Sequence, residues 1–471
     1  MNQHQPALTS SGGTPLSSLT WSAEFRALLL LAWPLIVAQL ARSALFTTDV
    51  IILGQLGAQF VAAGALANAL FVCIQLFGIG VVGAVAPMAA QALGARDRRT
   101  VRRTVRSGIW LAIALSLLLF PLAWNIGPIY AWMGQDPELI ALAEIFIHAA
   151  IWLLPPAFIF VALQSFLNAH GDTRAVLLIT VAGVFVNLLA NYVLVFGHWG
   201  FPALGIMGSG LATSLVNYAM LAFAIGYIQF NRKFRRYHIW HRFFTIDWDR
   251  MWPLVKIGLP IGFMLLAEVA LFTTASLLQG LLGEAELAAH SVALTIASLA
   301  FMVPLGLSHA TTVRVGLALG EKNKEGIRKA GWAALAITIV FMSGTAVIFF
   351  AFPHQIVGLF LNSGMAENQA PLALAASFLV VAGLFQIFDG TQVTMGAALR
   401  GISDTTMPLI FALVGYWAIG FPVAWYLGMH TPLRGTGVWF GLMAGLAAVA
   451  VVLTIRWAMR ERLGLTDHEP S

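Results

Sequence analysis

Three acidic residues interrupt long apolar stretches of this chain. Asp49 falls within residues 26–53, Glu268 within residues 252–282 and Asp389 within residues 371–398. If these stretches cross a membrane, an ionised side chain there costs about 3 kcal/mol or more, and such residues usually have a function. A buried carboxyl group can carry a proton or bind a hard cation such as Na⁺. The three acids are therefore the first candidates for a cation-handling site.

A second set of polar residues has the spacing of one helical face. Asn187 and Asn191 stand four residues apart within residues 175–197, and Thr213 lies in the next apolar stretch. Together with Asp49 they would offer one charged and several neutral oxygens, which suits a proton relay or a monovalent cation. Alternatively, the two asparagines only join helices through hydrogen bonds.

The composition indicates which elements carry these residues. Of the 471 residues, 59% are hydrophobic and only 10% are charged, and the mean hydropathy is +0.84. This is too little polar material to cover a soluble globule, so a lipid bilayer must solvate the chain. A helix needs about 20 apolar residues to cross a bilayer. Twelve stretches satisfy this requirement and predict an all-α polytopic membrane protein: 26–53, 61–88, 107–131, 141–167, 175–197, 205–229, 252–282, 287–310, 330–356, 371–398, 407–429 and 435–458.

The basic residues predict the orientation of these spans. They cluster after the second, sixth and eighth spans, within residues 96–106, 232–242 and 322–329. Lys and Arg are absent from four loops of the other set, residues 54–60, 134–139, 283–287 and 362–369. By the positive-inside rule, both termini face the cytoplasm across the plasma (inner) membrane. The isoelectric point of about 9.7 then reflects topology, and nucleic-acid binding is not expected.

The sequence also repeats itself. A shift of 226 residues places Ala44–Thr48 on Ala270–Thr274 and Gly57 on Gly283, and a later shift of 232 places Asp172 on Asp404. Two homologous, parallel six-span halves follow, with a transport pathway expected between them. Asp172 and Asp404 are expected to cap the helices that they precede. The predicted organisation is a polar cytoplasmic tail (1–25), an N-lobe (26–229), a cytoplasmic linker (230–250), a C-lobe (251–460) and a second cytoplasmic tail (461–471).

The three acids do not take part in this repeat. The shifts align Asp49 with Ala275, Glu268 with Arg42, and Asp389 with Ala157. A residue that the shared scaffold does not require is more readily explained by function.

Four segments resemble a known transporter family. They are Ala-Leu-Phe-Thr-Thr-Asp-Val-Ile-Ile-Leu-Gly from residue 44, Ala-Glu-Val-Ala-Leu-Phe from residue 267, Leu-Phe-Gln-Ile-Phe-Asp-Gly-Thr-Gln-Val from residue 384, and Leu-Arg-Gly-Ile-Ser-Asp-Thr from residue 399. The chain resembles the multidrug and toxic compound extrusion (MATE) family, in its bacterial NorM-type branch, from about residue 26 to 460. The resemblance implies an antiporter that exchanges H⁺ or Na⁺ for small, often cationic, organic molecules. It also implies a functional monomer without a cofactor other than the coupling ion.

The same resemblance assigns the polar residues to two sites. Asp49, Asn187, Asn191 and Thr213 match the family's N-lobe cation site, and Glu268 and Asp389 match its C-lobe acids. Phe385 stands one helical turn before Asp389, where relatives often have a tyrosine. One candidate hydroxyl ligand for Na⁺ is thereby missing from the second site.

Arg42 lies on the same face of the first span as Asp49. The two residues are seven positions apart, which is about 10 Å along a helix. One hypothesis is that Arg42 helps to hold Asp49 deprotonated in one state of the transport cycle. The alternative is that Arg42 reaches cytoplasmic water or pairs with an acid on another helix.

Other functions fit the sequence less well. A flippase for lipid-linked precursors, from the same wider superfamily, would need a cavity lined by Arg and Lys for its anionic cargo, and Arg42 is the only basic residue predicted well inside a span. The sequence contains neither a His-x-x-x-His metal motif nor a phosphate-binding Gly-x-x-x-x-Gly-Lys loop. An enzyme or an ATP-driven pump is therefore disfavoured. A channel remains an alternative to an antiporter.

Overall fold

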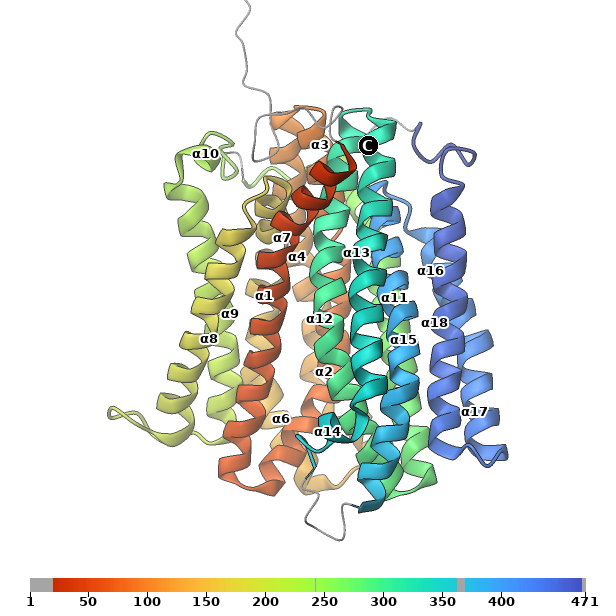
Figure 1. The fold of residues 1–471 in the computed structure, drawn as a ribbon. Coiled ribbons are helices and arrows are strands. Elements are labelled where there is room, and N and C mark those ends of the chain that lie inside the picture. Colours follow the sequence, from red (N-terminus) through yellow and green to blue (C-terminus); the bar gives the residue numbers. More distant parts are fainter. Residues whose placement is uncertain (1–19, 242, 362–368, 468–471) are drawn as a thin grey trace, which may run out of the picture. The chain divides into compact units, whose positions relative to one another are not determined.

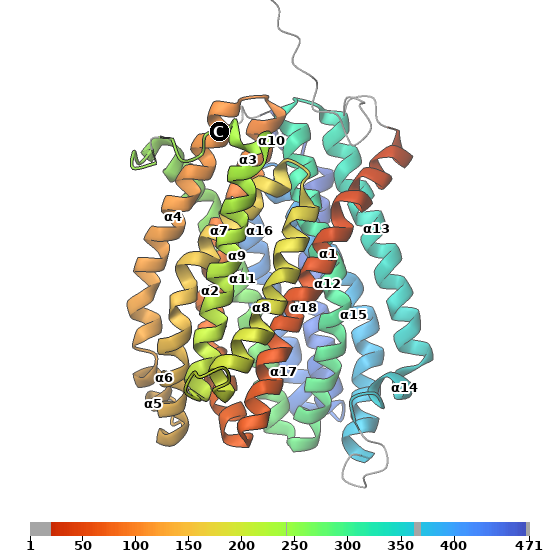
Figure 2. The same cartoon turned by 90° about the vertical axis from the view of Figure 1, so that its left-hand side faces the viewer.

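A computed structural model describes residues 20–241, 243–361 and 369–467, and their regular secondary structure is helical. Within these residues, twelve helical segments are long and apolar enough to cross a membrane. This confirms the predicted helical fold with twelve spans (Figures 1 and 2). The spans are α1 (Trp21–Leu56), α2 (Ala58–Val82) with α3 (Val85–Gly94), α4 (Arg98–Trp124), α6 (Pro137–Ala150) with α7 (Leu154–Ala169), α8 (Thr173–Phe196), α9 (Ile206–Phe230), α11 (Trp248–Leu282), α12 (Glu284–Gly320), α13 (Lys324–Ala351), α15 (Gln369–Gly401), α16 (Thr406–Leu413) with α17 (Phe421–His430), and α18 (Arg434–Ala458). Shorter helices are α5 (Gly127–Trp132), α10 (Arg232–Arg235) and α14 (Pro353–Val357).

The chain forms two compact units. The N-unit comprises Val37–Gly262, and the C-unit comprises Met1–Ile36 together with Phe263–Ser471. Helix α1 therefore begins in the C-unit and ends in the N-unit, whereas α11 does the reverse. The lobe boundaries inferred from the sequence remain a prediction.

The backbone repeats where the sequence repeats. Gly57 before α2 and Gly283 before α12 have φ angles of 132° and 148°, which side chains other than glycine rarely adopt. Asp97 and Asn323 occupy the same place before α4 and α13, and the side chain of each accepts a backbone N–H of the first helical turn. The duplication is thus visible in the turns as well as in the spans.

The expected capping role of Asp172 and Asp404 is wrong. Neither α8 nor α16 has a side-chain cap. Asp172 instead accepts a hydrogen bond of 2.7 Å from the hydroxyl of Tyr227, and Asp404 forms a two-pronged ion pair with Arg456, with Nε to Oδ2 at 2.5 Å. In each unit this interaction links the start of the fifth span to the end of the sixth. The carboxylate binds a side chain of the sixth span and therefore does not cap the fifth.

The linker between the halves packs against the N-unit. It contains α10, and Asp247 near its end accepts two hydrogen bonds from the guanidinium of Arg103 in α4. This interaction holds the pKa of Asp247 below its usual value. The end of the linker is therefore held against α4 by the ion pair between Asp247 and Arg103.

A buried ion pair fixes the first turn of α1 in the C-unit. Glu24 and Arg314 of α12 are 2% and 8% exposed, and the carboxylate accepts Nε at 3.0 Å and Nη2 at 2.5 Å. Helix α1 begins at Trp21, five residues before the first predicted span, and the assignment of residues 1–25 to a cytoplasmic tail stays a prediction. Residues 1–19 lie outside the described part of the chain.

Arg314 also corrects the expectation that Arg42 alone is a basic residue well inside a span. Helices α12 and α15 run past the predicted ends at residues 310 and 398, so that they include Arg314 and Arg400. Arg456 lies within the predicted stretch 435–458, close to the end of α18. Hydropathy alone places the span ends too early, because an arginine whose charge is balanced by a neighbour can lie within a helix.

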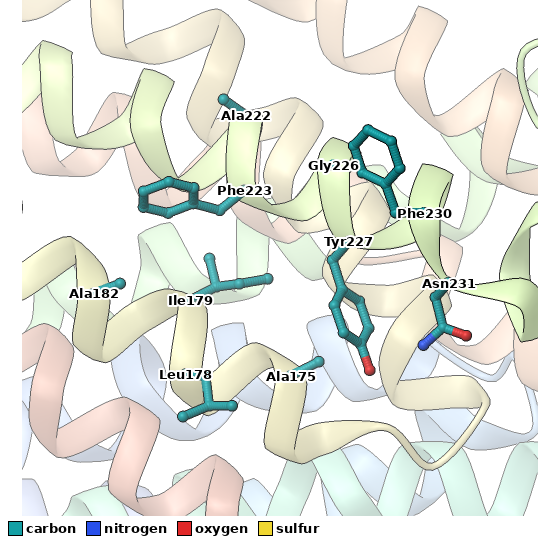
Figure 3. A pocket seen from close by; sticks show the side chains of 10 residues that line it. All are labelled: Ala175, Leu178, Ile179, Ala182, Ala222, Phe223, Gly226, Tyr227, Phe230 and Asn231. Atoms are coloured by element: carbon teal, nitrogen blue, oxygen red, sulfur yellow. The ribbon is translucent and has the colours of Figure 1, made fainter.

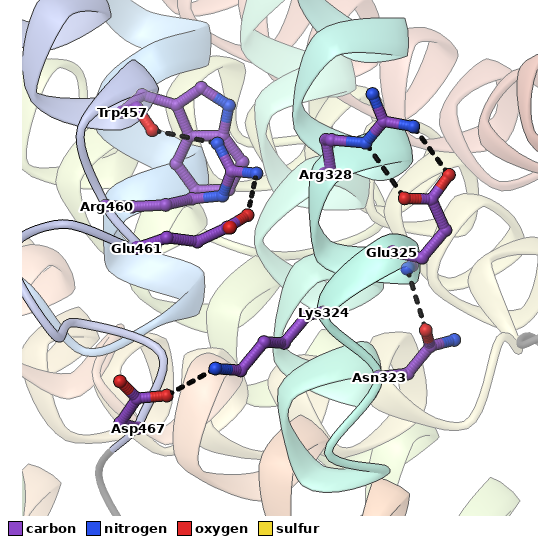
Figure 4. Close-up of polar contacts among 9 residues, drawn as sticks. Asn323, Lys324, Glu325, Arg328, Trp457, Arg460, Glu461 and Asp467 are labelled. Carbon is purple, nitrogen blue, oxygen red and sulfur yellow. Dashed lines mark hydrogen bonds and ion pairs between the residues drawn. The ribbon is translucent and has the colours of Figure 1, made fainter.

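The C-terminal segment folds back onto α13 in the C-unit (Figure 4). Lys324 Nζ donates to Asp467 Oδ1 at 2.7 Å, and the guanidinium of Arg460 lies over the ring of Trp457. Part of the predicted tail at residues 461–471 is thus ordered against the helices, and residues 468–471 lie outside the described part.

We expect Glu24→Gln to destabilise the protein strongly, because it leaves the buried guanidinium of Arg314 without a counter-charge. Removing one partner of a buried ion pair costs about 3 kcal/mol or more. The thermal midpoint of the purified protein should fall by several degrees. The matched control is Asp467→Asn, whose pair with Lys324 is more than half exposed on both sides, and it should leave the midpoint nearly unchanged. Equal midpoints for the two variants would contradict the structural role of Glu24.

Candidate cation sites

The four polar residues predicted for the first half meet in the N-unit. Asp49 of α1 accepts hydrogen bonds at Oδ1 from Asn187 Nδ2 (3.1 Å) and Asn191 Nδ2 (2.9 Å), both on α8. The hydroxyl of Thr213 on α9 lies 3.1 Å from Asp49 Oδ2. The carboxylate is therefore surrounded by three neutral donors from two other helices, within a membrane span.

The helix packing that creates this site depends on small residues. A Cβ atom on Gly208 of α9 would lie 2.5 Å from the backbone oxygen of Leu194 in α8. Only glycine permits this approach, which occurs one turn beyond Asn191 on α8. Because α8 and α9 lie this close, their side chains reach the same carboxylate.

The amide oxygens of this site are left without partners. Asn187 and Asn191 are 1% and 0% exposed, and their Oδ1 atoms accept no hydrogen bond within the described residues. Buried carbonyl oxygens of this kind usually have a partner. Their amide nitrogens face Asp49, so the amide oxygens could join Asp49 around a cation only after the amides rotate.

The two acids of the second half also lie near one another, in the C-unit. Glu268 of α11 and Asp389 of α15 interact electrostatically, and Asp389 is 5% exposed with no partner for Oδ1 among the described residues. Arg400, in the last turn of α15, lies close enough to act on Glu268. This site therefore combines two acids with one arginine, unlike the neutral surroundings of Asp49.

Phe385, which stands where relatives often have a tyrosine, packs against other aromatic side chains. Its buried ring makes edge-to-face contacts with Phe272 and Trp439, at centroid distances of 6.0 and 5.5 Å. A hydroxyl is present elsewhere, because the buried side chain of Tyr416 lies near both acids and its oxygen has no hydrogen-bond partner among the described residues. Tyr416 belongs to a π-helical turn between α16 and α17, a distortion that often marks functional positions.

The structure does not bring Arg42 to Asp49. Its Nη2 donates to Gln164 Oε1 on α7 at 2.6 Å, and the guanidinium lies over the ring of Phe160 at 5.8 Å. The partner is an amide on another helix, neither of the partners that the sequence suggested. The proposed influence of Arg42 on Asp49 remains untested.

The sequence analysis selects neither Gln164, which binds Arg42, nor Arg400 and Tyr416, which lie near the C-unit acids. Gln164 is a polar residue inside a predicted span and could have been selected by the rule that selected Asp49. Arg400 falls two residues beyond the predicted end of its span at residue 398, and Tyr416 has no polar neighbour in sequence. For the last two, only the folded chain reveals the proximity to Glu268.

Comparison with known proteins now identifies the family. The profile of the MatE family matches residues 34–193 and 260–426, once in each half. The chain belongs to the MatE family. A probable multidrug resistance protein NorM from Mesorhizobium japonicum is 43% identical over 445 residues, which cover 94% of this chain and 95% of the relative. A protein of the same description from Rhizobium meliloti is also 43% identical, over 94% of both chains.

Solved MatE-type structures have the same fold. A eukaryotic MATE transporter superimposes with a TM-score of 0.84 at 23% identity, over 95% of this chain and 99% of that structure. A transporter of the wider superfamily from Pyrococcus furiosus gives a TM-score of 0.85 at 21% identity, covering 98% of this chain and all of that one. The MatE assignment confirms the resemblance seen in the sequence, and the chain is a multi-pass membrane protein.

We expect that replacing Arg42 with Gln leaves the pH optimum of transport unchanged, because the guanidinium contacts Gln164 and Phe160 in this MatE protein. The measurement is substrate efflux from reconstituted vesicles over a range of pH. A displaced optimum would instead support the hypothesis that Arg42 holds Asp49 deprotonated.

Proposed function

We propose that this protein exports small organic molecules, often cationic, in exchange for H⁺ or Na⁺. The observation that carries the proposal is the convergence of Asn187, Asn191 and Thr213 on Asp49. The NorM relatives are described as probable multidrug resistance proteins, which supports small organic molecules as the cargo. The protein is not an enzyme in this proposal, and no cofactor is needed besides the coupling ion.

The chemistry of the N-unit site supports a cation switch. Three donors on Asp49 suit the ionised carboxylate, since each N–H or O–H stabilises negative charge. When a proton binds Oδ2, the hydroxyl of Thr213 can accept it while donating to the backbone oxygen of Ser209. A proton on Oδ1 would require an asparagine amide to rotate, and so would Na⁺, because the amide oxygens must then face the cation. Either cation therefore changes the hydrogen bonds that join Asp49 to α8 or α9.

The two C-unit acids form a second negatively charged site, whose charge would change during the transport cycle. Glu268 and Asp389 repel each other when both are ionised, and Arg400 offsets that repulsion. Binding of a proton, Na⁺ or an organic cation would remove the remaining imbalance. We assign these acids to coupling or to the charge of the cargo.

A flippase for anionic lipid-linked precursors is the alternative. Its cargo would require arginines that are free to bind phosphate. Arg314 and Arg456 are engaged by Glu24 and Asp404, and Arg42 by Gln164. These three arginines therefore already have partners, which favours organic cations over anions as the cargo.

The protein is proposed to act as a monomer in the plasma (inner) membrane with both termini in the cytoplasm. The positive-inside rule supports this orientation, since the basic loops follow even-numbered spans.

Replacing Asp49 with Asn preserves the shape of the side chain but removes its charge. Gradient-driven efflux should then fall to the level of vesicles without protein, whereas the amount of protein stays normal. Efflux is measured with pH and Na⁺ gradients imposed separately, and the gradient that drives the wild type identifies the coupling ion. The matched control is Asp136→Asn, which lies at an exposed helix start and keeps its capping ability. Wild-type efflux by Asp49→Asn, with unchanged dependence on the gradient, would refute the proposal.

The orientation can be tested with single cysteines in a Cys73→Ser background, since Cys73 is the chain's one native cysteine. Gln135→Cys, in a loop without basic residues, should react with a membrane-impermeant maleimide added outside intact cells. Lys324→Cys, in a basic loop, should react only after permeabilisation. The reverse pattern would place the termini outside.

A further inference from the structure

A groove runs along the surface of the N-unit between α8 and α9, at the end where α9 leads into α10. Its volume is about 650 Å³, within the range of roughly 300–1,000 Å³ typical of ligand pockets. Ile179 of α8 and Tyr227 of α9 point into the space between the two helices (Figure 3). The groove is lined mainly by apolar side chains, among them Leu178, Ile179, Ala182, Phe223 and Phe230.

Small residues keep this groove open. Ala182, Ala222 and Gly226 belong to its lining, and a Cβ atom added to Gly226 would meet no atom within 4 Å. Phe230 at the rim is 85% exposed. Because both helices are long and apolar enough to span a membrane, we infer that this exposed apolar surface faces hydrocarbon and that the groove is open to an acyl chain.

One end of the groove is polar and basic. Asn231 lines it, Arg232 follows directly, and Arg174 lies one helical turn before Leu178 on the same face of α8. Arg174 and Arg232 are exposed, and neither has a hydrogen-bond or ion-pair partner in the described part of the chain. The nearby acid, Asp172, already accepts from Tyr227 at 2.7 Å and interacts with Lys233.

We propose that this groove binds one anionic phospholipid from the leaflet that faces the basic loops. An acyl chain lies between α8 and α9 over Gly226, and Arg174 and Arg232 bind the headgroup phosphate. Basic pockets between spans on this side of a membrane are suited to such headgroups. The site lies on the helices that carry Asn187, Asn191 and Thr213, but the inference does not depend on antiport.

Charge complementarity selects this occupant over others. An organic cation would be repelled by Arg174 and Arg232, and a zwitterionic lipid would gain little from two positive side chains. Each basic side chain near an anionic headgroup contributes about a fivefold increase in affinity. Two of them predict a preference of about twenty-five-fold for an anionic over a zwitterionic lipid of equal chain length.

The test is native mass spectrometry of the purified full-length protein with phosphatidylglycerol or phosphatidylcholine of the same acyl chains. The wild type should retain one phosphatidylglycerol molecule at concentrations where phosphatidylcholine is lost. Arg174→Gln combined with Arg232→Gln should abolish the preference. Gly226→Leu should reduce retention of phosphatidylglycerol about tenfold or more by filling the groove, and Ala222→Leu provides a second filling variant if Gly226→Leu is poorly expressed.

Two matched controls separate this site from general effects. Arg26→Gln combined with Arg462→Gln removes the same charge from exposed residues of the C-unit. Gly344→Leu adds a leucine at a helical glycine of the C-unit that also has open space around it. Both controls should retain phosphatidylglycerol like the wild type. Equal retention of the two lipids by the wild type, undiminished retention by both filling variants, or the same loss in the controls would overturn the proposal.

Discussion

An ionised side chain inside a bilayer must be compensated by its neighbours, since water is absent and the energetic cost is several kcal/mol. Four of the charged residues within the spans meet this constraint in three ways. Asp49 is held by three neutral donors, Arg314 by Glu24, Arg456 by Asp404, and Arg42 by an amide and an aromatic ring. Of these four, only Asp49 keeps a negative charge without a counter-charge, so it attracts a cation. Glu268 and Asp389, which Arg400 alone offsets, form a second point of negative charge.

The duplication separates what builds the fold from what gives it function. Glycines 57 and 283 adopt the same unusual backbone conformation, and Asp97 and Asn323 cap equivalent helices. These features form turns, and each half needs them. The charged sites are not shared between the halves. The repeat aligns Asp49 with Ala275, which carries no charge. A similar divergence appears at Asp172 and Asp404, where a phenol in one half corresponds to a guanidinium in the other.

The sequence could predict the N-unit site because its signals are local. Apolar stretches define the spans, an acid inside a span is conspicuous, and Asn187 and Asn191 share a helical face by their spacing alone. The resemblance to a known family then predicts that the residues on these three helices form one site. Without it, the contact of Thr213 with Asp49, 164 residues away, has no local signal.

Other contacts could not be predicted for the same reason. Glu24 and Arg314 are 290 residues apart, and Glu24 lies where the composition indicates a polar tail. The span ends were misplaced because hydropathy treats every arginine as unpaired. Asp172 and Asp404 were assigned as caps because Asp commonly caps helices, whereas the structure gives each a partner on a later helix. In each case a distant partner overrides a local preference.

Helix α1 brings these observations together. Glu24 and Asp49 are 25 residues apart on one helix, about 37 Å at 1.5 Å per residue. The first is fixed in the C-unit by Arg314, and the second is bound in the N-unit by α8 and α9. Pro34 lies between them, where the helix lacks one backbone hydrogen bond and bends most easily. If a cation binds Asp49 and its bonds to α8 rearrange, the start of α1 cannot follow freely, because the ion pair holds it. Under the proposed cation exchange, we expect the helix to adjust around Pro34, close to Ile36, at which it passes from one unit to the other. The proposal thus links a single carboxylate to the one segment of α1 that is most easily bent.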